Sequence, residues 1–180
     1  MKKITGIFLA IALAFLFACE GEPGLPGQDG QDGKDGDSFI GLVLERTGDF
    51  TAENEYTLYY QFPEDITVYE SDVVLVYILW EQATDTNNDP IDVWRLLPQT
   101  IVLDEGVLQY NYDYTFADVQ IFLEGTIDLD SLLPAEALGQ TFRIVILPAD
   151  FARANDLDVT DYNLLMKSLG KENYKISSTF

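Results

Sequence analysis

The sequence contains no histidine and only one cysteine, Cys19, and these two shortages exclude several kinds of chemistry. Without histidine there is neither an imidazole base nor a histidine metal ligand. One cysteine can form neither an internal disulfide nor a cysteine-ligated zinc or iron–sulfur site within a single chain. The thiol of Cys19 is therefore left for another use.

Positive charge is also scarce, because 10 Lys and Arg stand against 31 Asp and Glu and give a formal net charge of -21. Such a surface repels phosphate backbones and anionic lipid headgroups, so we expect no binding to nucleic acid. The charge predicts an acidic, well-solvated exterior. Attraction of cations or of basic partners is the alternative use of the same charge.

No apolar run is long enough for a permanent membrane helix. Lys2 and Lys3 form a positive start, and the eleven residues from Ile7 to Phe17 form an uninterrupted apolar run. A run of this length is too short to span a bilayer and is typical of a secretory signal peptide. We therefore predict a signal peptide over residues 1–18.

The end of this leader, Leu16-Phe17-Ala18-Cys19, resembles the lipobox of bacterial lipoprotein signal peptides, although Phe17 departs from the usual small or branched residue. The resemblance implies that Cys19 becomes the mature N-terminus and carries a diacylglyceryl thioether and an amide-linked acyl chain. Two or more acyl chains anchor a protein stably in a membrane. Cys19 is thus the predicted lipidation site and the membrane the predicted partner.

Glu20 and Glu22 follow the cysteine directly and look like the surface-export signal of Bacteroidetes lipoproteins. This resemblance implies a lipid-anchored protein of the outer membrane that faces the cell surface. In proteobacteria an acidic residue at this place can instead favour retention in the inner membrane. The residues leave the membrane face open between these readings.

Glycine then occupies every third position from Gly21 to Gly36, which is the collagen signature, because only glycine fits where three polyproline II chains meet. Residues 19–38 therefore form a predicted collagen-like stalk. From Gly21 onward five carboxylates stand against Lys34 alone, and the repeat is short, so a homotrimer would need help from the acyl chains or the downstream domain. The alternative is a single-chain spacer of roughly 50 Å at about 3.1 Å per residue.

From residue 39 to residue 180 the composition changes to short apolar and alternating runs, which are typical of strands. The absence of long helical patterns between them predicts a mainly β domain, an antiparallel β-sandwich or jelly roll. The expected strands are Phe39–Arg46, Tyr56–Phe62, Val73–Trp80, Val93–Leu97, Thr100–Leu103, Val107–Tyr114, Val119–Leu123 and Phe142–Leu147.

Two segments carry further expectations. Val73–Trp80 is apolar on both faces, so it belongs either in the centre of the fold or at a subunit contact. Thr160–Gly170 predicts a short C-terminal amphipathic helix with Thr160 as N-cap and Gly170 at its end. Single helical turns are expected within Ala149–Asn155 and Ser131–Leu138.

The candidate sites each have a simpler interpretation. The segment Asp85–Asp92 has carboxylate or amide side chains at alternate positions, as calcium-binding loops do. Pro90 and Leu96 stand where such a loop needs glycine and glutamate, which favours a solvated hairpin loop. An acidic cluster near the C-terminus is explained by helix capping. A set of aromatic residues could form an exposed binding platform, and the alternative is that these residues pack in the core. The members of these two sets are Asp156, Asp158 and Asp161 for the acidic cluster, and Trp80, Trp94, Tyr110, Tyr112 and Tyr114 for the aromatic platform.

No Gly-x-Ser-x-Gly elbow, phosphate loop or dinucleotide fingerprint is present, and no pair of carboxylates stands out for glycoside hydrolysis. We therefore expect that the protein is not an enzyme. We also expect no catalytic residues, no cofactor and no metal ligands.

The lipobox, the short repeat and the acidic β-rich domain with Tyr69–Tyr77, Val93–Gln99 and Val145–Asp150 together resemble the collagen-like lipoproteins of Bacteroidetes. The resemblance implies location and architecture, and it brings no functional residue beyond Cys19. We expect a lipid-anchored envelope protein that presents its domain for structural or adhesive interaction. The alternative is an accessory that binds a glycan or peptide beside another outer-membrane protein.

Overall fold

A computed structural model of the chain describes residues 41–154, 158–170 and 176–177. The chain divides into two units, Met1–Gly36 and Asp37–Phe180, and the described residues all belong to the second. The predicted signal peptide, Cys19 and the collagen-like repeat lie outside the described residues, so they stay predictions.

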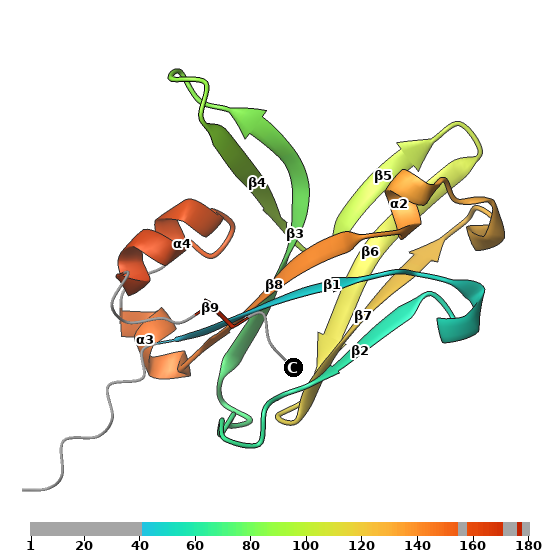
Figure 1. The fold of residues 1–180 in the computed structure, drawn as a ribbon. Helices are drawn as coiled ribbons and strands as arrows, with labels where there is room; N and C mark the ends of the chain where they lie inside the picture. Colours follow the sequence, from blue (N-terminus) through green and yellow to red (C-terminus); the bar gives the residue numbers. More distant parts are fainter. Residues whose placement is uncertain (1–40, 155–157, 171–175, 178–180) are drawn as a thin grey trace, which may run out of the picture. The chain divides into compact units, whose positions relative to one another are not determined.

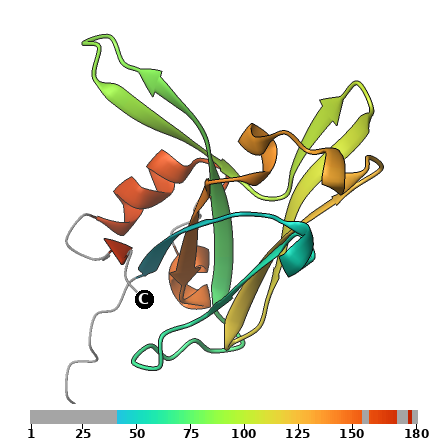
Figure 2. The ribbon, with the colours of Figure 1, turned by 45° about the vertical axis from the view of Figure 1, so that its right-hand side comes forward.

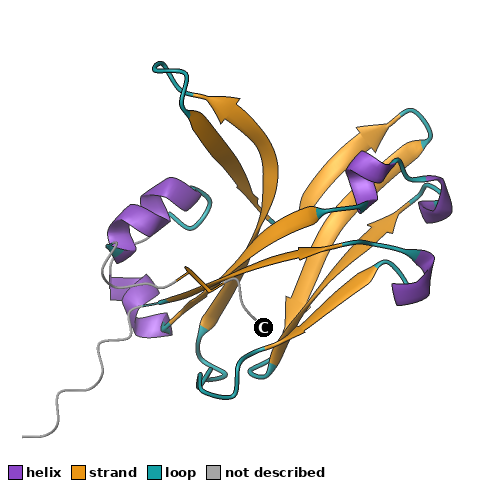
Figure 3. Cartoon of the chain, viewed as in Figure 1, coloured by secondary structure: helices purple, strands orange, loops and turns teal. Residues whose placement is uncertain are grey.

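Strands dominate the described residues and form two sheets that pack face to face as a sandwich (Figures 1 and 3). One sheet has the strand order β4-β3-β8-β1-β9 and the other the order β2-β7-β6-β5. All pairs are antiparallel except β1 with the two-residue β9. The strands are β1 (Leu42–Gly48), β2 (Thr57–Gln61), β3 (Val73–Thr84), β4 (Pro90–Leu96), β5 (Gln99–Leu103), β6 (Gly106–Tyr114), β7 (Asp118–Gly125), β8 (Gln140–Leu147) and β9 (Ile176–Ser177).

All eight expected strands are present, and the mainly β sandwich is confirmed. The largest difference is the β3–β4 hairpin, which runs on to Thr84 and starts again at Pro90 instead of covering only Val73–Trp80 and Val93–Leu97. Its outer part carries exposed side chains on both faces, so no apolar alternation marks it. Figure 1 shows this hairpin extending beyond the rest of its sheet.

Short helices fill the connections between strands. Two expected turns are confirmed, because Ala149–Ala154 forms α3 and the region 131–138 contains α2 (Pro134–Ala137), preceded by the 3-10 turn η3 (Leu129–Ser131). A further 3-10 turn, η2 (Ala52–Asn54), connects β1 with β2.

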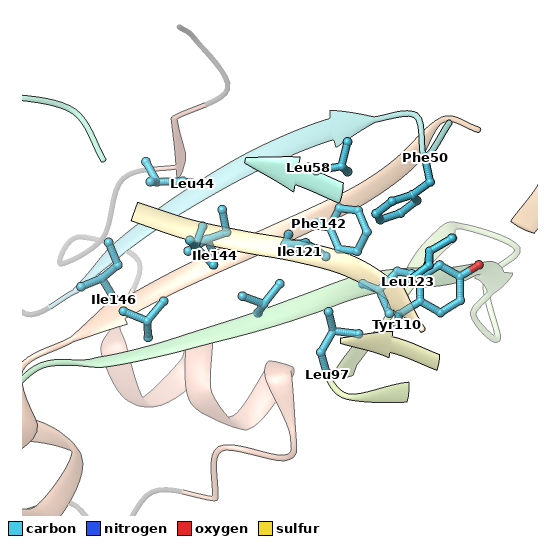
Figure 4. Packing of buried hydrophobic residues seen from close by; sticks show 14 of the residues in the cluster. Leu44, Phe50, Leu58, Leu97, Tyr110, Ile121, Leu123, Phe142, Ile144 and Ile146 are labelled. Carbon is cyan, nitrogen blue, oxygen red and sulfur yellow. The ribbon is translucent and has the colours of Figure 1, made fainter. Parts of the chain in front are cut away.

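The main core lies between the two sheets. Alternate residues of β1, β3 and β8 point into it and meet alternate residues of β2, β6 and β7, as the period of two along a strand requires. Phe50 joins them between β1 and β2, with edge-to-face ring contacts to Tyr110 and Phe142 (Figure 4). This apolar packing supplies most of the driving force for folding.

The outer face of the β3–β8–β1 sheet carries a second core. Val43, Tyr77 and Val145 point away from the sandwich and are fully buried, because helix α4 (Tyr162–Leu169) covers them. Strand β3 thus has one face in each core, and of the two expectations for Val73–Trp80 the central position is correct.

The C-terminal helix is confirmed, and it buries the side chains that the helical spacing singled out: Tyr162, Leu165, Met166 and Leu169. Gly170 ends it with a positive φ of 74°. The expected N-cap was wrong by one residue. The carboxylate of Asp161 accepts from the Leu164 amide at 3.0 Å, whereas the Thr160 hydroxyl donates to Asp158 at 2.6 Å.

Two adjacent leucines of α4 test the role of the second core. Leu165 is 1% exposed and Leu164 is 51% exposed, while helix propensity is the same for both. We expect Leu165→Ala to lower the free energy of unfolding by about 2 to 5 kcal/mol, because it removes a buried side chain and leaves a cavity. Leu164→Ala should change it by less than about 0.5 kcal/mol.

Urea denaturation followed by circular dichroism measures both values. Equal effects of the two substitutions would contradict the assignment of α4 as the cover of the outer sheet face.

Candidate functional site

The five candidate aromatic residues do not share one surface. Tyr110 is buried, and Tyr112 donates to the Val74 carbonyl at 3.2 Å. Trp80 packs against the main core, with the Arg95 guanidinium 4.0 Å from its ring centroid. Trp94 belongs to the second core, and only Tyr114 is clearly exposed. Four of the five are thus used in packing.

Arg143 organises a polar cluster on the outer sheet face. Its Nε donates to Glu45 Oε2 at 2.8 Å, and its Nη1 donates to the Tyr162 hydroxyl at 2.7 Å. The guanidinium also lies 4.1 Å from the Trp94 ring centroid. These contacts connect three strands with α4, so the cluster fastens the helix to the sheet.

The acidic loop at the tip of the β3–β4 hairpin is organised by its own hydrogen bonds, as the hairpin interpretation predicts. The carboxylate Oδ1 of Asp85 accepts from the Asp89 amide at 2.9 Å and from the Asn87 amide at 2.7 Å. These two bonds lower the pKa of Asp85. Within the part of the chain that the structure describes, no group of three or more His, Cys, Asp or Glu is arranged to hold a metal ion.

A cavity of about 510 Å³ lies at one end of the sandwich, between the β5–β6 turn and the η3–α2 segment, residues 129–138. Leu103, Ile127 and Leu132 contribute apolar surface to its wall. Asp104 and Glu105, in the turn, contribute carboxylates, as does Glu136 of α2. Its lining residues include no Lys, Arg or aromatic residue.

The backbone of β6 and that of the residues after β7 approach each other closely just before Ile127, which lines the cavity. The Thr126 amide donates to the Val107 carbonyl at 2.9 Å, and the Val107 amide donates to the Thr126 hydroxyl at 3.0 Å. A Cβ on Gly125 would lie 2.3 Å from the Val107 carbonyl oxygen, so this position requires glycine.

The η3–α2 segment is held over the sandwich end by hydrogen bonds to its backbone. The Tyr110 hydroxyl donates to the Glu136 carbonyl at 2.5 Å, and the Phe50 amide donates to the Ala137 carbonyl at 2.8 Å. Leu133 stays 64% exposed beside the cavity. Smaller cavities of about 110 and 190 Å³ border the same segment.

The cavity lies at the end of the sandwich opposite the first described strand residues. In the register of β1 and β8, Leu42 pairs with Ile146, and Gly48 pairs with Gln140, which lies two residues after the end of the η3–α2 segment. The first residues of β1 therefore lie at one end of the sandwich, and the η3–α2 segment, which borders the cavity, lies at the other (Figures 1 and 2).

The sequence contained no signal for this site. Its wall comes from the β5–β6 turn, the residues after β7 and the η3–α2 segment, and consists of ordinary aliphatic and acidic residues. Cys19, the site residue that the sequence did single out, lies outside the described residues.

Comparisons with protein-family models, with curated proteins and with solved structures found no match to this chain. In the described residues, no helix is both long and apolar enough to cross a membrane. The site must therefore be interpreted from its own geometry.

Tyr110 gives a test of how the η3–α2 segment is held. Burial, together with the charge of Glu136, raises the pKa of Tyr110 from 10.0 to about 12. The folded state thus favours the neutral phenol. The resulting contribution to the free energy of unfolding is fully present below pH 10 and is lost as the pH rises from 10 towards 12. We expect Tyr110→Phe to lower the free energy of unfolding at neutral pH by about 1 kcal/mol.

Between pH 10 and 12 the free energy of unfolding of Tyr110→Phe should fall less than that of the wild type, because the variant has no phenol at this position. Urea denaturation across this range measures the difference, and Tyr69→Phe, which alters an exposed ring, is the control. Parallel stability curves for Tyr110→Phe and the wild type would refute the linkage.

Proposed function

We propose that this chain is a lipid-anchored protein of the cell envelope, attached through Cys19 to the outer membrane and facing the cell surface. The repeat Gly21–Gly36 serves as a spacer, and the β-sandwich is presented for structural or adhesive interaction. The observation that carries the proposal is the position of the only cysteine, directly after an apolar leader and directly before the glycine repeat.

The layout of the sandwich suits presentation. The β5–β6 turn and the cavity lie at the end of the sandwich opposite the start of β1, and we expect partners to bind there. The acidic exterior keeps such a domain soluble and discourages its self-association.

We propose a non-enzymatic role, because the chain has no histidine and its one thiol is assigned to the lipid. A ligand-binding accessory that acts beside another outer-membrane protein is the second candidate. The cavity of about 510 Å³ favours it, since a hollow of that size can seat several side chains of a peptide or a small ligand.

Lipid attachment is tested by expression of the full chain with its leader in a Bacteroidetes host. Growth with an alkyne fatty acid should label the wild type, and Cys19→Ser should abolish the label because it removes the acceptor sulfur. The wild type should fractionate with the outer membrane and be sensitive to protease added to intact cells. Ser38→Ala, a substitution at the last residue of the predicted stalk, is the control.

Fatty-acid label on Cys19→Ser, or recovery of the wild type in the aqueous fraction, would overturn the anchoring proposal. Label with protection from external protease would retain the anchor and overturn the surface-facing orientation.

The repeat is expected to act as a single-chain spacer, because Glu22 and four Asp residues stand against Lys34 in each chain. Sedimentation equilibrium of the Cys19→Ser chain should therefore give the monomer mass of 20.2 kDa. A mass three times larger would establish the homotrimer instead.

A further inference from the structure

Strand β5 is an edge strand without the usual protection. Among the described strands it is the last of its sheet and pairs only with β6. Natural edge strands are commonly guarded by charged residues, proline or a bulge, because their free backbone groups can recruit another strand. The five residues Gln99–Leu103 include no charge and no proline, and Val102 is 80% exposed.

Of the other described edge strands, β9 has two residues, and β4 and β2 are long enough to compare with β5. Strand β4 carries Pro90, Asp92 and Arg95, which guard it. Strand β2 is also uncharged, but none of its residues lines the cavity. The β5 edge therefore combines freedom from charge with a neighbouring cavity, whose lining includes Val102 and Leu103.

The charges beside this edge indicate the chemistry of an occupant. Asp104 and Glu105 are exposed in the turn that directly follows β5. The Glu136 carboxylate is already engaged, because its Oε2 accepts from the Leu133 amide at 2.8 Å. No cation lines the cavity, so the turn carboxylates favour a Lys or Arg of the occupant.

Two other occupants fit less well. A glycan site generally offers an aromatic ring on which a sugar can stack, and the lining of this cavity has none. Pairing of β5 with a second copy of the chain would join two molecules that each carry a formal net charge of -21.

We propose that the β5 edge and the adjoining cavity bind an extended segment of a partner protein in which Lys or Arg alternates with β-branched residues. The segment pairs with β5 through its backbone, as in β-strand addition. It places apolar side chains against the cavity wall and its cations at Asp104 and Glu105. Five paired residues would span about 17 Å at about 3.4 Å each. The inference rests on the proposed interaction role and names its surface and partner.

The test uses the full chain in detergent and a fluorescent peptide, Thr-Lys-Val-Lys-Val-Lys-Val-Thr, with fluorescence anisotropy as the readout. A peptide with Glu in place of each Lys should bind at least about tenfold more weakly, because it meets the turn carboxylates with like charge. A peptide N-methylated at every residue should also bind at least about tenfold more weakly, because it cannot donate to β5.

Variants locate the binding. Asp104→Lys combined with Glu105→Lys should weaken binding of the Lys peptide at least about tenfold. The matched control, Glu64→Lys with Asp65→Lys, makes the same charge change in the β2–β3 loop at the opposite end and should weaken it less than about twofold. Amide shifts in the NMR spectrum of the wild type, expected at Thr100, Val102 and the η3–α2 segment, give a readout that needs no variant.

Equal binding of the N-methylated peptide would overturn strand pairing. Equal weakening by both charge-reversed pairs, shifts elsewhere, or binding of glycans but not of the Lys peptide would overturn the site. These results are independent of Cys19. Loss of peptide binding with intact lipid labelling would refute this inference alone, and the reverse would refute only the anchoring.

Discussion

The structure depends on one constraint, which is that strands β1, β3 and β8 are apolar on both faces and must be covered twice. Phe142 and Ile144 of β8 point into the sandwich and are fully buried, whereas Val145 points to the other side and is also fully buried. A single opposing sheet cannot cover both faces. Helix α4 is therefore a necessary part of the domain.

The polar contacts of the outer face serve the same constraint. Arg143 lies among Glu45, Trp94 and Tyr162, and its hydrogen bonds and ring contacts hold α4 in register with the sheet. Burial of this arginine is tolerable because its charge is paired and hydrogen-bonded. A cluster that resembles a functional site by its residue types is thus explained by packing.

Coverage is less complete at the ends of the sandwich, and the candidate site results from this. The η3–α2 segment is fastened through Tyr110 and Phe50, yet it leaves a cavity beside the β5–β6 turn. The neighbouring β5 edge has no charge of its own, while the turn after it carries Asp104 and Glu105. An apolar, hydrogen-bonding edge beside concentrated negative charge is suited to a basic extended segment.

The alternation of residues such as those in Tyr56–Phe62 was enough to predict the strands, and the spacing of Tyr162, Leu165 and Leu169 was enough to predict α4. The outer part of the β3–β4 hairpin was missed because Glu81–Thr84 is exposed on both faces and shows no apolar period. The aromatic residues were candidates for an exposed binding platform although most of them are used in packing, because a tyrosine such as Tyr110 looks the same in sequence whether it is exposed or buried.

By itself the sequence determined the strand and helix pattern, the acidic character and the absence of imidazole chemistry, because these depend on composition and on local periods of about two and 3.6 residues. Only the tertiary structure decided which strands share a sheet, which face α4 covers and where a cavity remains. The lining residues Leu103, Ile127 and Leu132 come together through long-range pairing of β5, β6 and β7 and the packing of the η3–α2 segment. No local sequence pattern predicts that these three residues lie side by side.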